Sequence, residues 1–104
     1  MIRTIKEKLI VKHVEKQLSK YDIQLMHFIP GRIRLQSPEW KKNDRLIECI
    51  MTKLKEQILV YEVKFTASTG SLLITYDASY MTDMKEIESW FYIVDQVYKE
   101  EFKA

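Results

Sequence analysis

Hydrophobic positions along the first third of the chain change their spacing, and each change marks the border of a structural element. Through residues 2–19 they recur at near-helical intervals with lysines between them, which predicts an amphipathic first helix. Residues 21–29 alternate instead, as in an extended strand. Strict alternation predicts that His27 lies on the same side as Leu25 and Ile29, so we expect a partly buried structural histidine there.

The spacing changes again in the rest of the chain. Helical intervals return from Leu46 to Ile58, and residues 59–77 then alternate on both sides of the turn sequence at 67–71, which predicts a β-hairpin. In the first strand of this hairpin the alternation predicts a buried face made by Leu59, Tyr61, Val63 and Phe65. A last helix is expected to begin near the caps Thr82 or Asp83, with Asp83 and Glu86 forming a box-like pair and an apolar face reaching Phe102.

One proline and one glycine stand side by side at Pro30 and Gly31, between two strand-like runs. Proline fixes φ and lacks an N–H, whereas glycine permits positive φ, so the pair must bend or break the backbone. We interpret it as a bend that splits the first strand. Beyond it, Arg32 and Arg34 share one strand face, while the apolar residues between and after them share the other.

Two sequences compete to begin the second helix. Ser37, Pro38 and Glu39 offer a hydroxyl cap, a proline for the first turn and an acid against the helix dipole. Asn43 and Asp44 offer an alternative cap six residues later. The sequence leaves both open.

The order of elements predicts an α+β fold of the ferredoxin-like type, a two-layer sandwich with the order strand, helix, strand, strand, helix and an extra N-terminal helix. We expect one domain over residues 1–104, with 1–20 as a peripheral amphipathic helix and 21–104 as the core. No fourth strand is evident after Asp77, so the first strand is expected to be an exposed edge. The N-terminal helix or a second subunit, in a homodimer, would then cover that edge.

Composition narrows the class of protein. A chain of 104 residues that is 46% hydrophobic suits one modest core, and its short apolar runs predict neither a membrane span nor a signal peptide. We therefore expect a soluble cytoplasmic protein. Its single cysteine, Cys49, excludes an internal disulfide and a Cys-x-x-Cys site, and its place in the apolar stripe predicts a semi-buried, inert thiol.

Charge is unevenly distributed although the formal net charge is only +2. Residues 1–20 carry six basic and two acidic side chains, whereas residues 77–104 carry seven acidic and three basic ones. The two ends are expected to form solvated helix faces that pack near one another. Alternatively, residues 1–20 contact an acidic partner or, peripherally, an anionic membrane surface.

The segments "HFIPGRIRLQSPEW" and "VYEVKFTASTGSLLITYD" together resemble the heavy-metal-associated-like domains that carry a Pro-Gly-Arg-x-Arg strand and a Thr-Gly-Ser hairpin ending in Tyr-Asp. The resemblance covers about residues 21–80. It implies a small metallochaperone-like fold often found beside, or fused to, cation-transporting P-type ATPases. It does not extend to the metal loop: metal-binding relatives have Met-x-Cys-x-x-Cys between first strand and first helix, whereas residues 37–42 here contain no thiol and two lysines. We therefore expect no metal site in this loop.

A few side chains remain as candidates for binding. Arg32 and Arg34 present two guanidinium groups to a partner carboxylate, a phosphate or a haem propionate, and Lys41 and Lys42 add positive charge nearby. His27 is the candidate ligand of a haem iron or metal ion. Trp90 and Tyr92 lie off the main helical stripe; we expect them in the core, and an exposed patch that contacts a partner is the alternative.

Other classes of function find little support. No Ser/His/Asp, Cys/His or paired-carboxylate arrangement stands out, and the aromatic-rich strand signature of RNA-binding sheets is missing. The sequence therefore predicts a non-catalytic binding or adaptor protein in metal or haem homeostasis, without a cofactor or nucleic acid, docked on a partner such as a cation ATPase. The alternative is a direct haem or metal-ion carrier that uses His27 and the Arg32/Arg34 face.

Overall fold

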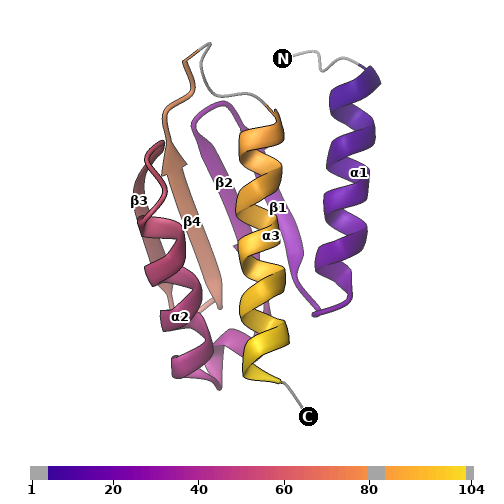
Figure 1. Ribbon diagram of the computed structural model, residues 1–104. Helices are drawn as coiled ribbons and strands as arrows, with labels where there is room; N and C mark the ends of the chain where they lie inside the picture. The colour runs from indigo at the N-terminus through magenta and orange to yellow at the C-terminus, as the bar shows by residue number, and fades with distance from the viewer. Residues whose placement is uncertain (1–4, 80–83, 103–104) are drawn as a thin grey trace.

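The computed structural model describes residues 5–79 and 84–102, which form an antiparallel sheet and helices that cover one of its faces (Figure 1). The elements follow the chain in this order: α1 (Ile5–Ser19), β1 (Gln24–Ile29), β2 (Arg32–Gln36), a short 3-10 helix η1 (Pro38–Lys41), α2 (Asp44–Lys55), β3 (Val60–Thr66), β4 (Ser71–Tyr76) and α3 (Met84–Glu101). No helix in the described residues is both long and apolar enough to cross a membrane.

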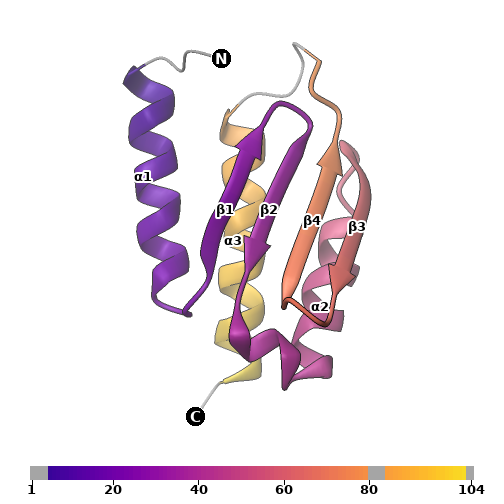
Figure 2. The same cartoon turned by 180° about the vertical axis from the view of Figure 1, so that it is seen from behind.

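The four strands lie in the order β1-β2-β4-β3, and every neighbouring pair is antiparallel. This α+β arrangement is compatible with a ferredoxin-like fold. Seen from behind, the other face of the sheet carries no helix of the described chain (Figure 2). α3 lies between α1 and α2, so the basic first helix and the acidic last helix pack side by side as expected (Figure 1).

The expectation of a missing fourth strand was wrong. No strand follows β4 in the described residues, but the segment before Pro30 is a complete strand that pairs with the segment after it. Pro30 and Gly31 therefore form the reverse turn of a β1-β2 hairpin instead of a bend within one strand. Gly31 has φ +87°, and its carbonyl accepts a 3.0 Å hydrogen bond from the backbone N–H of Tyr76. β1 thus supplies the fourth strand from the N-terminal side.

Each edge strand contains an irregularity that breaks the predicted alternation. The pairing of β1 with β2 shifts between Leu25 and His27, and the pairing of β3 with β4 shifts between Val60 and Glu62. An extra residue in a β-bulge reverses the side on which the following side chains lie. His27 is consequently exposed instead of partly buried, and Tyr61 is 69% exposed instead of facing the core.

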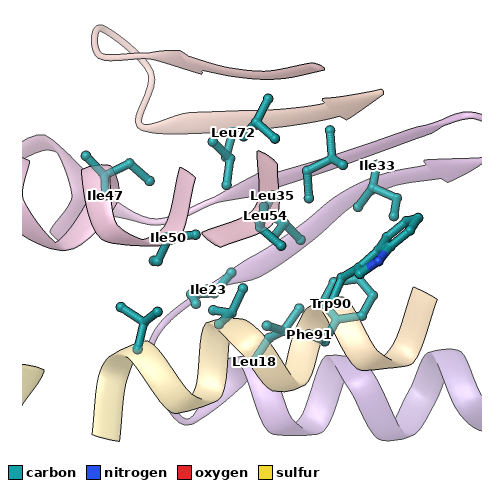
Figure 3. Close-up of a cluster of buried hydrophobic side chains, with 14 of the residues drawn as sticks. Leu18, Ile23, Ile33, Leu35, Ile47, Ile50, Leu54, Leu72, Trp90 and Phe91 are labelled. Atoms are coloured by element: carbon teal, nitrogen blue, oxygen red, sulfur yellow. The ribbon is translucent and has the colours of Figure 1, made fainter. Parts of the chain in front are cut away.

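The hydrophobic core lies between the covered face of the sheet and the three helices (Figure 3). Strands β2 and β4 contribute fully buried aliphatic side chains from their alternate positions, because these strands are central and have regular registers. Helices α1, α2 and α3 each add a stripe of buried residues. The core residues labelled in Figure 3 are Leu18, Ile23, Ile33, Leu35, Ile47, Ile50, Leu54, Leu72, Trp90 and Phe91.

The helical stripes are shorter than the spacing predicted. Ile58 lies beyond the end of α2 and is 95% exposed, and Phe102 is exposed after α3. Trp90 is buried against Tyr76, with ring centroids 5.2 Å apart, as expected of a core residue, whereas Tyr92 is exposed, so the alternative of an aromatic patch is reduced to Tyr92.

Each of the two candidate caps before α2 precedes a helical segment, but only Asn43 caps one with its side chain. Ser37 precedes η1, with Pro38 in its first turn, although the Ser37 side chain makes no capping hydrogen bond. The Asn43 side chain accepts a 3.1 Å hydrogen bond from the backbone N–H of Leu46 and caps α2. The predicted caps Thr82 and Asp83 lie outside the described residues.

The β3-β4 turn is fastened to the end of β2 by a close approach of backbones. The Gly70 carbonyl accepts a 3.0 Å hydrogen bond from the N–H of Ser37. Gly70 has φ +67°, and a Cβ at this position would lie 2.6 Å from the Ser37 carbonyl oxygen. The contact therefore requires glycine for two reasons, conformation and space.

Gly70→Ala should destabilise the protein more than Gly31→Ala. Both alanines would adopt a left-handed conformation at a cost of about 1–2 kcal/mol, but a Cβ on Gly31 would meet its nearest atoms at an ordinary 3.6 Å. At Gly70 the clash adds about 1–3 kcal/mol. Urea unfolding followed by circular dichroism measures both free energies. Equal losses in the two variants would contradict the assigned contact.

A second set of contacts joins the connection between α1 and β1 to α3. The Tyr21 hydroxyl donates a hydrogen bond to the Asp95 carboxylate, and its ring stacks on Tyr98 with centroids 4.2 Å apart. The Nζ of Lys99 lies 3.1 Å from Oδ2 of the same carboxylate. Burial and the bond to Asp95 raise the pKa of Tyr21 to about 12, and the Tyr21 and Lys99 bonds hold the pKa of Asp95 below its ordinary value.

The hydrogen bond between Tyr21 and Asp95 should stabilise the fold less at low pH and at high pH than near neutral pH. This stabilisation is fully present between the unfolded-state pKa values of about 4 for aspartate and about 10 for tyrosine. It is lost as pH falls through the lowered pKa of Asp95 or rises towards the raised pKa of Tyr21. Tyr21→Phe should therefore cost about 1 kcal/mol near pH 7, and this cost should shrink at pH 3 and pH 11.

Urea unfolding across this pH range measures the difference. Tyr92→Phe is the matched control, because it removes a tyrosine hydroxyl from an exposed position on the same helix, three residues before Asp95, and the tyrosine hydroxyl bonded to Asp95 is that of Tyr21. It should leave stability unchanged at every pH. A Tyr21→Phe cost that stays constant from pH 3 to pH 11 would show that the hydroxyl–carboxylate bond is not its source.

Candidate binding face of the sheet

The open face of the sheet carries a row of side chains centred on Arg34. In the strand register Arg34 lies opposite His27 of β1 and Leu73 of β4, and Leu73 lies opposite Lys64 of β3. Side chains at directly opposite positions share one face and lie close enough to interact. The bulge in β1 therefore brings His27 next to Arg34, as strict alternation would not.

A second row follows two residues along β2. Arg32 lies opposite Ile29 of β1 and Thr75 of β4, and Thr75 lies opposite Glu62 of β3. The two arginines therefore stand in successive rows of the same face, both exposed.

These rows border an open depression of about 400 Å³. It follows the length of β2, because all three open-face residues of that strand line it. The lining residues are Met26, His27, Arg32, Arg34, Gln36, Thr69, Ser71 and Leu73.

Positive charge dominates this face. Arg32, Arg34 and Lys64 contribute three cations, whereas Glu62 is the carboxylate that the register places among them. None of the three cations makes an ion pair with another residue in the part of the chain that the structure describes. The face is thus suited to anionic groups, and guanidinium groups bind carboxylates in a bidentate manner.

Hydrogen bonds fix the polar end of the depression. The Gln36 side-chain Nε2 donates to the Thr69 carbonyl at 2.8 Å, and the Thr69 hydroxyl donates to the Ser71 hydroxyl at 2.8 Å. These bonds join the end of β2 to the β3-β4 turn, so this end of the depression is rigidly placed.

Four of the predicted site residues lie outside the depression. Lys41 and Lys42 are exposed in and after η1, beyond the end of β2, and do not line the depression. Pro30 and Gly31 form the turn at the opposite end of the strand. Of the predicted anion-binding set, the structure therefore brings only Arg32 and Arg34 together, with His27 beside them.

Sequence reasoning missed several lining residues. The alternation of β4 places Ser71 and Leu73 on the open face, and pairing with β2 brings them next to Gln36 and Arg34. The alternation of β4 could be predicted from the sequence, but its pairing with β2 could not. Strict alternation already places Met26 on the side opposite Leu25, and the bulge brings His27 to that same side, so the two residues line the depression together.

The loop that corresponds to the metal-binding loop of heavy-metal-associated domains is closed by packing. Trp40 of η1 is fully buried, and its indole Nε1 donates a 2.9 Å hydrogen bond to the hydroxyl of Tyr98 on α3. Burial is the main cause of the raised pKa of Tyr98. The ring of Trp40 thus packs into the core, and residues 37–42 contain no thiolate, so the residues of this loop do not fit a soft metal ion.

The rest of the described chain offers no substitute cluster. No group of three or more His, Cys, Asp or Glu side chains is placed to hold a metal ion among the described residues. Cys49 is partly buried on α2, and its Sγ lies 3.9 Å from a carboxylate oxygen of Glu101.

Comparison with known families gives one match. The model of the family described as Heavy metal associated domain 2 matches residues 6–99, and this span includes α1 as well as the sheet. No curated protein and no solved structure matches the chain. Because the match covers nearly all of the sequence, the chain belongs to the Heavy metal associated domain 2 family.

Proposed function

We propose that this protein is a non-catalytic adaptor in metal or haem homeostasis, and that it docks on a partner protein through the open face of its sheet. Family membership supports a metal-related binding function. The observation that carries the proposal is the pair Arg32 and Arg34 in a depression of the uncovered face, with no ion-pair partner among the described residues.

The closed loop at Trp40 supports docking over direct metal capture at the usual place of the fold. Residues 37–42 contain no cysteine, and the tryptophan of this loop is buried and bonded to Tyr98. A heavy-metal-associated domain without its metal loop keeps its surface as the means of recognition. The partner we propose is a cation-transporting P-type ATPase, because such domains often occur beside or within these transporters.

Site-specific photo-crosslinking tests this function. A photoreactive residue at position 26, an exposed position that lines the depression, should crosslink a metal or haem transport protein in the cells from which the sequence comes. The control places the same residue at position 53, exposed on α2 on the other side of the molecule. Adding Arg32→Glu and Arg34→Glu to the position-26 protein should remove the crosslink.

The identity of the crosslinked protein decides the outcome. A transport protein captured from position 26 but not from position 53 supports the proposal. Capture of proteins unrelated to metal or haem transport, or capture that survives the two arginine substitutions, contradicts it.

A direct carrier of haem or of a metal ion is the second candidate. It is favoured by the exposed position of His27, which lines the depression beside Arg34 and Met26. An imidazole and a thioether are both ligands of haem iron, and arginine binds the haem propionates.

Hemin titration separates this candidate from the adaptor. A carrier should give a shifted Soret band that His27→Ala removes and that His13→Ala, a change at an exposed histidine of α1, leaves intact. Absence of the band, together with protein that stays metal-free after exposure to Cu(I), Zn(II) and Fe(II), would contradict a carrier function.

A further inference from the structure

The depression on the open face runs along β2, and the side chains of β2 that line it are spaced like alternate residues of an extended peptide. Arg32, Arg34 and Gln36 are alternate residues of β2, and all three line it. Alternate residues of a strand are about 7 Å apart. An extended peptide lying along β2 presents its own alternate side chains at this same interval, so its residues i and i+2 can face Arg32 and Arg34 together.

Apolar groups flank the arginines. Leu73 lies opposite Arg34 on β4, Met26 lines the depression from β1, and Ile29 lies opposite Arg32. Met26 and Ile29 are exposed. Methylene groups of a glutamate side chain can pack on such neighbours while the carboxylate reaches the guanidinium group.

The same lining argues against a nucleic acid. Single-stranded nucleic acids bind sheet faces by stacking bases on aromatic side chains. The residues that line the depression include no phenylalanine, tyrosine or tryptophan. The positive charge and the spacing of the arginines therefore favour an extended peptide over a nucleic acid as the bound molecule.

We infer that the depression binds an extended acidic segment of the partner, with carboxylates at alternate positions facing Arg32 and Arg34. This inference rests on the proposed docking function and specifies the chemistry of the docked segment. Hydrogen bonds among Gln36, Thr69 and Ser71 hold the far end of the depression in place for such a segment.

Two synthetic peptides of equal composition test the inference. Both are acetylated and amidated, one with the sequence Thr-Thr-Glu-Thr-Glu-Thr-Thr and the other with Thr-Thr-Glu-Glu-Thr-Thr-Thr. Only the first places both glutamates on one side of an extended chain. It should bind about fivefold more tightly, because the second pairs one carboxylate at a time. NMR titration of the isotopically labelled protein measures both affinities and locates the shifted amides.

Paired substitutions provide the control. Arg32→Ala with Arg34→Ala should abolish the preference, whereas Lys53→Ala with Lys55→Ala, which removes the same charge from α2, should preserve it. The dispersion of the amide spectrum reports whether each variant is folded. A preference that survives the arginine substitutions in a folded protein overturns the inference.

Three other results also overturn it: equal binding of the two peptides, shifted amides confined to the helices, and tighter binding of inorganic phosphate or of a single-stranded oligonucleotide to β2. The crosslinking experiment separates this inference from the proposed function. A crosslink to a transport protein without a peptide preference overturns the acidic segment alone, whereas a peptide preference without that crosslink overturns only the adaptor function.

Discussion

Burial of only one face of the sheet is the constraint on which the rest of this structure depends. Because all described helices lie on the same side, each strand must sort its residues by position, with apolar groups towards the helices and polar groups away from them. Leu35 and Leu72 pair across β2 and β4 on the covered side. The uncovered side keeps the polar and charged side chains, and this division places Arg32 and Arg34 there.

The loop at Trp40 keeps its place in the fold but is closed by packing. The strand, the loop and the following helix are all present, but the loop is a short 3-10 helix whose tryptophan packs into the core and bonds to Tyr98. Where metal-binding relatives have thiolates in this loop, this chain has a tryptophan that packs into the core. A position that serves chemistry in those relatives here stabilises the contact between the loop and α3.

The sequence predicted correctly those parts of the structure in which the spacing of hydrophobic residues is regular. The positions of the helices, the pairing of β3 with β4 as a hairpin and the basic face of β2 followed from spacing, because these elements keep one period over most of their length. The bulges near Met26 and Tyr61 did not, since one extra residue reverses all following side chains without altering composition. The turn at Pro30 and Gly31 was located correctly but interpreted as a bend, because pairing between strands is a property of the folded sheet.

The two bulges bear on how readily the edges of the sheet can pair with further chains. A flat, regular outer strand offers its unpaired N–H and carbonyl groups as a template on which further chains can add. Here each of the two outer strands, β1 and β3, contains an irregularity that interrupts its ladder and increases local twist. The same irregularity that turns His27 outwards therefore also discourages the sheet from growing into a fibre.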